Sequence, residues 1–312
     1  MKILVTGGAG FIGSHVVDQF LDAGHQVVVV DDLSTGRTSN LNLNARFYHV
    51  DIRSPEMREV LKQEQPEVIS HLAAQIDVRR SVADPIFDAE INILGSIRLA
   101  QLASEFGVRK FIYISSGGAA YGEPVYLPCD ENHPVQPLSP YGASKYTFEL
   151  YLYILKGTTG LDYTVLRYPN VYGPRQDPYG EAGVVAIFTG QMLRNEPVAI
   201  YGSGEQMRDF VYVTDCAKAN LLVLERGSGR IYNLASGVGT TINQIFYGLK
   251  EATGYQYEPV YEPPKPGETY RIYLDASRAR QELGWGQEVD LAAGLEQTVE
   301  YFRRVELKTS AG

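Results

Sequence analysis

The first half of the chain alternates short apolar runs with amphipathic segments. The runs rich in β-branched residues predict strands at 2–6, 26–32, 46–50, 68–74 and 110–116. The segments between them place apolar residues at helical spacing and predict helices at 14–23, 58–65 and 91–107. Strands that are apolar on both faces and separated by helices are typical of a parallel sheet covered on both sides. Right-handed crossovers then predict a doubly wound α/β fold.

The sequence pattern changes after about residue 167, where prolines and glycines become frequent. Helices are predicted at 213–225, 242–253, 275–283 and 292–304, and short strands at 210–213 and 231–234. We therefore expect a Rossmann domain over residues 1–167 and a smaller mixed α/β domain, which would bind the substrate, over residues 168–312. Segments near 209–234 are expected to return to the first sheet.

The composition is that of an ordinary globular chain, and it narrows the function classes. Of 312 residues, 44% are apolar and 21% are charged, so the chain can bury a large core. The formal charge is −9 and no basic run occurs, which argues against nucleic-acid binding. Two cysteines and five scattered histidines indicate neither a disulfide framework nor a metal site. With no apolar stretch of about 18 residues, we expect no membrane contact and a cytoplasmic protein.

A glycine-rich segment lies where a dinucleotide-binding loop would be. Residues 7–13 read GGAGFIG, directly after the first predicted strand and at the start of the first predicted helix. Glycine lets the backbone approach a pyrophosphate, and the helix start presents unpaired N–H groups to it. Ser14, and not a lysine, follows the last glycine, which argues against an ATP-type phosphate loop. The segment therefore predicts a dinucleotide cofactor.

Two acidic residues at strand ends bear on which dinucleotide is expected. Asp31 lies about 20 residues beyond the glycines, where a carboxylate can accept both ribose hydroxyls of an adenosine. A 2′-phosphate would be repelled there, so NAD is favoured, while the nearby Arg37 leaves NADP open. Asp51, after the third strand, is a candidate for the adenine amino group. A helix N-cap ahead of Ser54 is an equally good interpretation of Asp51.

Tyr141 and Lys145 form the strongest candidate for catalysis. Pro140 precedes them and a helix is predicted over 145–155, so their i, i+4 spacing places phenol and ammonium on one helix face. A free phenol has a pKa of about 10, but a neighbouring ammonium and a nicotinamide cation favour its phenolate. Such a phenolate can remove a hydroxyl proton while a hydride leaves the same carbon. The alternative is an ordinary half-buried tyrosine.

A serine hydroxyl is expected beside Tyr141, at the carboxyl edge of the sheet where ligands bind in this fold. Ser115 and Ser116 end the predicted strand 110–116, and either of them can supply it. A second pair with the same spacing, Tyr261 and Lys265, encloses two prolines and cannot continue a helix.

Seven motifs, in order along the chain, resemble those of the extended short-chain dehydrogenase/reductases. They are TGGAGFIGSH, DDLSTG, HLAAQ, SSGGAAYG, SPYGASK, RYPNVYGPRQ and MRDFVYV. Within that family the chain is most similar to the UDP-glucose 4-epimerase (UDP-galactose 4-epimerase) branch, from residue 1 to about residue 285. The resemblance implies reversible oxidation at C4 of a nucleotide sugar by a tightly bound NAD. It also implies a 4-keto intermediate that turns over before it is reduced on its opposite face.

The resemblance assigns roles to residues by their position in the motifs. Tyr141 is the implied acid/base, Lys145 is its partner on the nicotinamide ribose, and Ser115 or Ser116 is the catalytic serine. The implied cofactor-binding residues, besides Tyr141 and Lys145, are Gly7, Gly10, Phe11, Ile12, Gly13, Asp31, Asp32, Leu33, Ser34, Thr35, Gly36, Asp51, Ile52, Leu72, Ala73, Ala74, Gln75 and Asn92. The implied substrate-binding residues are Asn170, Val184, Ala199, Tyr201, Arg208, Lys265 and Arg271. The family also implies a UDP-sugar substrate and a homodimer.

Several positions depart from the family pattern. Gly117 and Gly118 stand where related dehydratases and decarboxylases carry acidic residues, which argues against elimination of water. Lys265 stands where the family has an arginine on the diphosphate, with Arg271 as an alternative, and Ile272 leaves the acceptance of N-acetylated sugars open. The leading interpretation is a UDP-glucose/UDP-galactose 4-epimerase. The alternatives are a UDP-GlcNAc or UDP-glucuronate 4-epimerase, a sugar-nucleotide oxidoreductase, and a dinucleotide-sensing regulator.

Overall fold

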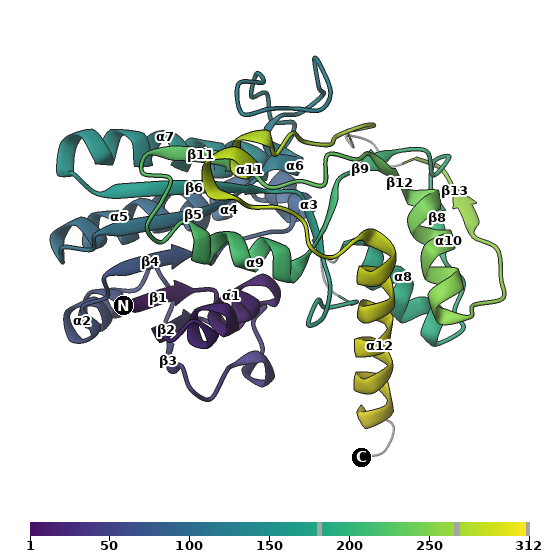
Figure 1. Cartoon of the computed structure of the whole chain (residues 1–312), viewed down its shortest axis with the longest axis horizontal. Coiled ribbons are helices and arrows are strands. Elements are labelled where there is room, and N and C mark those ends of the chain that lie inside the picture. Colours follow the sequence, from purple (N-terminus) through teal and green to yellow (C-terminus); the bar gives the residue numbers. More distant parts are fainter. Residues whose placement is uncertain (180–182, 265–268, 310–312) are drawn as a thin grey trace.

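A seven-stranded parallel sheet forms the centre of the computed structural model, which describes residues 1–179, 183–264 and 269–309 (Figure 1). The strand order across the sheet is β11–β6–β5–β4–β1–β2–β3, and every neighbouring pair is parallel. The strands are β1 (Lys2–Thr6), β2 (Gln26–Asp31), β3 (Arg46–His49), β4 (Val68–His71), β5 (Lys110–Ser116), β6 (Asp162–Tyr168) and β11 (Arg230–Asn233). The order runs outward in both directions from β1 and β4, as in a doubly wound fold.

Helices cover both faces of the sheet, because alternate strand residues point to opposite sides. Ile3 and Val5 of β1 belong to a buried cluster with α1 (Phe11–Asp22) and α9 (Val213–Leu222). Leu4, which lies between them, belongs to a second buried cluster on the opposite face. That cluster includes residues of α2 (Glu56–Glu64), α5 (Ser96–Glu105) and α7 (Pro140–Thr159). The apolar side chains therefore fill the two faces, and polar ones gather where the loops leave the carboxyl edge.

Short helices follow the carboxyl ends of three strands. After β2 comes the 3-10 turn η1 (Thr38–Asn40). After β4 come α3 (Val78–Ala83), α4 (Pro85–Ala89) and the π-helical turn η2 (Glu90–Gly95), which leads directly into α5. After β5 comes α6 (Gly117–Ala120). Of these elements, α3, α4, η2 and α6 pack against α7 and bring several polar side chains to the same edge of the sheet.

A second group of elements lies to one side of the sheet (Figure 1). Its helices α8 (Val184–Leu193), α10 (Ile242–Thr253) and α12 (Leu291–Thr309) share a third buried cluster. Its two-stranded sheets pair β7 (Asn170–Tyr172) with β10 (Phe210–Tyr212), β8 (Ala199–Tyr201) with β13 (Val260–Glu262), and β9 (Met207–Arg208) with β12 (Thr240–Thr241). By contrast, α11 (Ser277–Leu283) packs against β11 of the main sheet. Within the described residues, no helix combines the length and the apolar character that a membrane span requires.

The predicted doubly wound fold is confirmed, and some predicted elements match their observed bounds. The predicted strand 110–116 is β5, and the predicted helix 242–253 is α10. Other predictions need correction: β4 ends at His71 rather than at residue 74, and the helix expected from residue 91 begins as the π-helical turn η2 at Glu90. The sequence did not predict β6, which carries Asp162 and Arg167 among its apolar residues, or α8, which is apolar nearly all round.

The two short strands expected near residues 209–234 have different partners. β11 lies beside β6 at one edge of the main sheet. β10 pairs instead with β7 in a separate two-stranded sheet. The chain thus leaves the main sheet after β6 and comes back to it with β11. The division into domains at residues 167/168 stays a prediction.

Candidate active site

The glycine loop between β1 and α1 brings backbone very close to backbone. Gly7 has φ +70°, and a Cβ at this position would lie 2.7 Å from the amide nitrogen of Ala73. A Cβ on Gly13 would lie 2.0 Å from the carbonyl oxygen of Gly7. Gly10 caps α1 without a side-chain hydrogen bond, so the N–H groups of Phe11 and Ile12 begin the helix without such a partner. This loop has the shape and the polarity of a pyrophosphate cradle.

Asp31 closes the other side of this cradle at the end of β2. It is buried, and its two oxygens accept the N–H groups of Ala9 (2.9 Å) and Leu33 (2.8 Å). Burial raises the pKa of Asp31, and the two backbone hydrogen bonds lower it. Each oxygen keeps a lone pair for a ribose hydroxyl. Arg37, the cation that left NADP open, pairs with Asp177 at 2.7 Å.

The loop from Asp32 to Gly36 wraps around Asp31. Leu33 adopts φ +57°, and a Cβ on Gly36 would lie 2.6 Å from Asp31 Oδ1. Ser34 donates its N–H and its hydroxyl to Asp32 (2.9 and 2.6 Å). Thr35 lies between these positions, so the whole predicted adenosine segment forms one tight loop at the end of β2.

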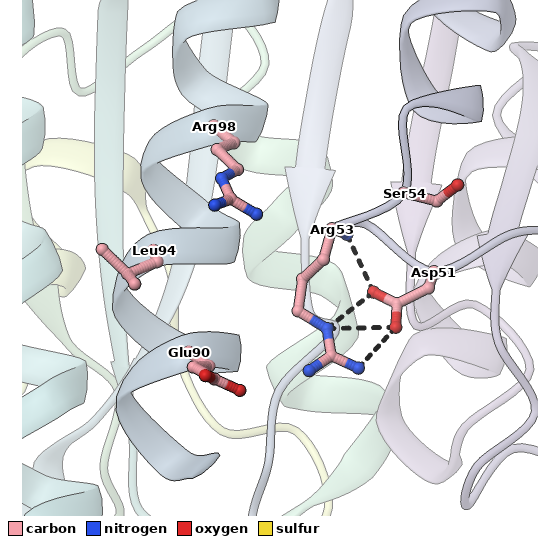
Figure 2. Close-up of a pocket in the computed structure, with 6 residues that line it drawn as sticks. All are labelled: Asp51, Arg53, Ser54, Glu90, Leu94 and Arg98. Carbon is pink, nitrogen blue, oxygen red and sulfur yellow. Dashed lines mark hydrogen bonds and ion pairs between the residues drawn. The ribbon is translucent and has the colours of Figure 1, made fainter. Parts of the chain in front are cut away.

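Asp51 lies at the rim of a cavity of about 430 Å³, which Figure 2 shows in close-up. The cavity is lined by Asp51, Arg53, Ser54, Glu90, Leu94 and Arg98. Arg53 donates its backbone N–H to Asp51 Oδ1 at 2.8 Å and pairs with Oδ2 at 2.6 Å (Figure 2). These hydrogen bonds lower the pKa of Asp51. The N-cap of α2 is Pro55, so the capping interpretation of Asp51 does not hold.

Neither Arg53 nor the η2–α5 wall of this cavity was among the predicted residues. The sequence signal that could have indicated Arg53 is its position two residues after Asp51, the candidate acid for the adenine amino group. Ile52, by contrast, is buried, and a Cβ on Gly95 would lie 3.2 Å from its Cδ1 atom. Of the two residues predicted to lie near adenine, Asp51 therefore has a partly exposed carboxylate, and Ile52 has a buried apolar side chain.

The segment Leu72–Gln75 follows β4 and is held in place by Asn92 on η2. Asn92 accepts the N–H of Gln75 through Oδ1 and donates Nδ2 to the Gln75 carbonyl, both at 2.9 Å. Ala73 donates its N–H to Thr6 Oγ1 at 3.2 Å, and Ala74 lies between these two anchors. The structure thus brings this segment, the glycine loop and Asn92 together at one edge of the sheet.

Tyr141 lies in the first turn of α7. The helix begins at Pro140, and Ser139 caps it by accepting the N–H of Gly142 at 3.1 Å. Burial raises the pKa of the Tyr141 phenol to about 12, a hydrogen bond with Ser116 lowers it, and the carboxylate of Asp88 raises it. Phenolate formation in this site therefore needs positive charge beside the phenol.

Lys145 lies one helical turn beyond Tyr141 and is buried. Its Nζ lies 4.4 Å from the centre of the Tyr113 ring. Among the described residues its ammonium has no salt-bridge partner. Burial lowers the pKa of Lys145 to about 7, whereas the carboxylates of Glu149 and Asp88 raise it. Burial thus moves the two pKa values in opposite directions: the pKa of the Tyr141 phenol rises and the pKa of the Lys145 amine falls.

The two candidate serines at the end of β5 have different partners. Ser115 is buried, and its Oγ donates to Glu149 Oε1 at 2.6 Å. Glu149 also forms a buried ion pair with Arg167, 2.6 Å between Oε2 and Nη2. Ser116 is only partly buried, and its hydroxyl lies beside the phenol of Tyr141, whose pKa it lowers. The structure therefore brings Ser116, Tyr141 and Lys145 together and directs Ser115 into the core.

The predicted substrate residues that the structure describes belong to the second group of elements. Arg208 on β9 and Arg271 are neighbours, because Met207 and Arg271 form a parallel β-bridge. Asn170 begins β7, and its Oδ1 atom would lie 3.6 Å from a Cβ on Gly118. Val184 begins α8, and Ala199 and Tyr201 bound β8. Lys265 lies outside the described residues.

Tyr201 is also one of the residues around a second cavity, of about 530 Å³. Its lining consists of Tyr201, Gly202, Ser203, Gln206, Glu262, Pro264, Thr269 and Tyr270. Apart from Tyr201 these residues were not predicted, because they come from loops far apart in the sequence and carry no motif.

Comparisons with known proteins agree with this geometry. The model of a family described as the NAD dependent epimerase/dehydratase family matches residues 3–235. A Methanocaldococcus jannaschii protein named putative UDP-glucose 4-epimerase is 48% identical over 96% of this chain and 98% of its own length. The crystal structure of Thermotoga maritima UDP-glucose 4-epimerase with UDP-glucose superposes with a TM-score of 0.97 at 53% identity, covering 98% of this chain and 100% of that one. The Thermus thermophilus UDP-glucose 4-epimerase complex with NAD gives 0.92 at 42% identity, covering 97% and 99%.

Proposed function

This chain belongs to the NAD dependent epimerase/dehydratase family, and from that membership we propose that it interconverts UDP-glucose and UDP-galactose. The observation that carries the proposal is the grouping of Ser116, Tyr141 and Lys145 at the carboxyl edge of a doubly wound sheet, beside a glycine loop closed by Asp31. The relatives named UDP-glucose 4-epimerase match nearly the whole chain. The reaction is inversion at C4 through a 4-keto intermediate.

The residues of the cradle fit NAD. The loop from Gly7 to Gly13 has no room for side chains at its closest approaches, and it presents the start of α1 to a pyrophosphate. Asp31 has lone pairs left for two ribose hydroxyls, and its charge disfavours a 2′-phosphate. When bound, NAD accepts the C4 hydride and returns it. Because the cofactor is restored in each turnover, we expect it to stay bound.

The chain's own residues handle the proton. Tyr141, as a phenolate, accepts the proton of the 4-hydroxyl group and later returns it to the same oxygen. Ser116 donates its hydroxyl to hold that oxygen in line with the phenol. Lys145 contributes positive charge one turn away, which offsets the burial that raises the pKa of Tyr141 to about 12. Ser115 donates its hydroxyl to Glu149, which lies on the same helix as Tyr141 and Lys145, and so ties the end of β5 to that helix.

The substrate residues suit a sugar that must turn over. We propose that Arg208 and Arg271 hold the diphosphate, with Asn170 beside them, and that Val184, Ala199 and Tyr201 bind the remainder of the nucleotide. Guanidinium groups pair strongly with phosphate oxygens and fix that end of the ligand. The hexose itself has few fixed polar contacts, so the 4-keto sugar can present its opposite face to the nicotinamide.

The structure gives a physical reason to favour epimerisation over dehydration. Elimination of water needs an acid in the loop after β5, where this chain has Gly117 and Gly118. Neither glycine can supply that proton. A Cβ on Gly117 would also lie 2.3 Å from Leu274 Cδ1, whereas one on Gly118 would make an ordinary 3.6 Å contact with Asn170 Oδ1. A dehydratase is therefore disfavoured, although the family includes such enzymes.

We also propose a homodimer, which the apolar surface of α7 supports. On this helix Leu150, Tyr153 and Ile154 are 48%, 73% and 52% exposed, and Leu94 on the neighbouring η2 is 48% exposed. An apolar surface of this kind on a globular protein is typical of a subunit interface. In a two-fold dimer each substitution acts twice, so Tyr153→Glu should give monomers in light scattering. An unchanged dimer in that variant would place the interface elsewhere.

We propose a cytoplasmic location for this protein. Cys129 and Cys216 are free thiols, and both are buried. Burial raises the pKa of Cys129 to about 12, so its thiol stays protonated and unreactive. Unpaired thiols of this kind are typical of proteins from reducing compartments.

The test uses the purified protein without added cofactor. Its bound nucleotide is first quantified by absorbance after denaturation, and UDP-galactose is then added. We expect UDP-glucose to appear with no net NADH. Accumulating NADH would indicate an oxidoreductase, and full cofactor occupancy without turnover would indicate a regulator. A panel with UDP-GlcNAc, UDP-glucuronate and dTDP-glucose then ranks the substrates by which C4 centre inverts.

A further inference from the structure

Asp88 is a charged side chain beside the active site that no step of the proposed reaction uses. It lies on α4 and is 1% exposed. Its Oδ1 atom accepts hydrogen bonds from Gln75 Nε2 (2.9 Å) and Asn92 Nδ2 (3.0 Å). Its Oδ2 atom is buried and has no hydrogen-bond partner among the described residues. A buried carboxylate oxygen without a partner is costly, and such a group requires an explanation.

We propose that Asp88 is a positioning residue of the active site, and that its carboxylate supplies the negative charge that holds Lys145 as an ammonium beside Tyr141. The contacts of α4 place it there. Asn92, which donates to Asp88, also donates to Ser144 Oγ at 3.3 Å, and Ser144 precedes Lys145 on α7. α4 packs directly against α7.

The alternative counter-charge for Lys145 is already committed to another residue. Glu149 lies one turn beyond Lys145, but it forms a buried ion pair with Arg167, with donor–acceptor distances of 2.6 and 3.0 Å. It also accepts the hydroxyl of Ser115. The guanidinium of Arg167 therefore offsets most of the charge of Glu149. Among the residues that the structure describes, no cation forms an ion pair with Asp88, so its charge acts on Lys145 in addition to that of Glu149.

The other charged groups on the elements packed against α4 are on α3 and η2. Asp77 caps α3 by accepting the N–H of Arg80, and the guanidinium of Arg80 lies over the Phe87 ring at 3.9 Å. Arg79 is also on α3, and Glu90 of η2 lines the outer cavity. On α7 the groups that face Asp88 are Tyr141 and Lys145. Behind them, β5 contributes the phenol of Tyr113.

The charge of Asp88 affects both members of the catalytic pair. It raises the pKa of Lys145, which favours the ammonium, and it raises the pKa of Tyr141, which favours the phenol. This role rests on the proposed function, because an epimerase must take a proton and give it back in one turnover. A phenolate that is too stable would take the proton and not return it. By keeping Lys145 cationic, Asp88 preserves the charge that favours the phenolate, while its direct effect on Tyr141 keeps the phenol able to take the proton back.

The substitution Asp88→Asn tests this role with little change of shape. The amide oxygen can keep both hydrogen bonds of Oδ1, and the amide nitrogen takes the place of the unpartnered Oδ2. Asp84→Asn is the matched control on the same helix, since Asp84 is an exposed N-cap and asparagine caps equally well. Asp88→Glu keeps the charge. The Lys145→Met variant identifies which lysine NMR signal belongs to Lys145.

The readout is the pH midpoint of Lys145 ionisation in the NAD-loaded protein, measured by heteronuclear NMR of protein that carries isotope-labelled lysine. We expect Asp88→Asn to lower this midpoint by about one pH unit, the scale for one unit charge within about 10 Å in a protein interior. The basic limb of the kcat/KM profile, which reports loss of the ammonium, should move in the same direction. Asp84→Asn should leave the midpoint unchanged. Asp88→Glu, which keeps the charge, should have a midpoint close to that of the wild type.

An unchanged or raised midpoint in folded Asp88→Asn would overturn the role of Asp88. If that variant does not fold, Asp88→Ser, which is smaller and also uncharged, undergoes the same titration and must show the same downward shift. The titration needs no turnover, so it separates two failures. A lowered midpoint in a protein that inverts no nucleotide sugar would refute the proposed function alone. Normal epimerisation with an unmoved midpoint would refute the role of Asp88 alone.

Discussion

The buried ion pair between Glu149 and Arg167 should be essential for stability, and Glu149→Gln tests it most directly. The carboxylate and guanidinium are 1% and 3% exposed, and two hydrogen bonds of 2.6 and 3.0 Å join them. Arg167 also donates to the hydroxyl of Tyr121 at 2.7 Å. Glutamine keeps the volume but leaves the Arg167 cation buried without a counter-charge.

Removal of one partner from a buried ion pair costs about 3–5 kcal/mol of folding free energy. For a chain of this length, that corresponds to a decrease in melting temperature of about 5–8 °C. Because Ser115 donates to the same carboxylate, the end of β5 should loosen as well. The measurement is thermal unfolding followed by circular dichroism, with the chemical denaturation midpoint as a second readout.

The double variant Glu149→Met/Arg167→Met is the control for this reasoning. It replaces both charges by apolar side chains of similar volume, and such replacements are often neutral to within about 1–2 kcal/mol. We therefore expect the double variant to be more stable than Glu149→Gln. If Glu149→Gln melts within about 1 °C of the wild type, the pair does not contribute in the way that its burial indicates. A double variant that loses the sum of the two single losses would also refute the coupling.

Three further predictions concern the active-site edge. Tyr141→Phe should keep its fold and its bound NAD and lose about 10²–10⁴ in kcat. Turnover assays and quantification of the bound cofactor check this together. Turnover like that of the wild type would remove the phenol from the mechanism. Gly117→Asp should lower the free energy of unfolding by about 1–3 kcal/mol in denaturant titrations, because a Cβ there meets Leu274 at 2.3 Å. It should gain no dehydratase activity. Unchanged stability would mean that Leu274 moves aside freely. Burial lowers the pKa of Lys145 from 10.5 to about 7, so the unfolded chain binds more protons between these pH values, and this residue destabilises the cofactor-free protein most at and below pH 7. Lys145→Met should therefore melt higher than the wild type at pH 7, with a gap that narrows toward pH 10; a constant gap would contradict the buried-amine assignment.

The sequence predicted the parts of the fold that repeat a local pattern. The apolar run of β5 and the periodic helix α10 were placed at their observed bounds, because their signals lie within one segment. The same holds for the glycine loop and for the Tyr141–Lys145 spacing, since both motifs are short and contiguous. Asp31 was found because its position after the second strand is set by the motif.

The parts that the sequence did not predict depend on contacts between distant segments. Glu149 and Arg167 lie on different elements, and neither residue signals its partner by spacing. Asp88 lies in a helix of one turn, too short to produce a periodic pattern, and its burial is visible only once α4 packs against α7. The choice between Ser115 and Ser116 likewise needed the position of Glu149, which directs one hydroxyl into the core.

The return of the chain to the main sheet has a consequence for biosynthesis. β11 is the outermost strand beside β6, yet it is translated after more than half of the second group of elements. During synthesis the nucleotide-binding half therefore emerges with β6 as an open edge, and an open edge is a site for wrong pairing between nascent chains. A ribosome-bound or truncated chain that stops before Arg230 should need a chaperone, whereas one that includes Asn233 can cover β6 with its own β11.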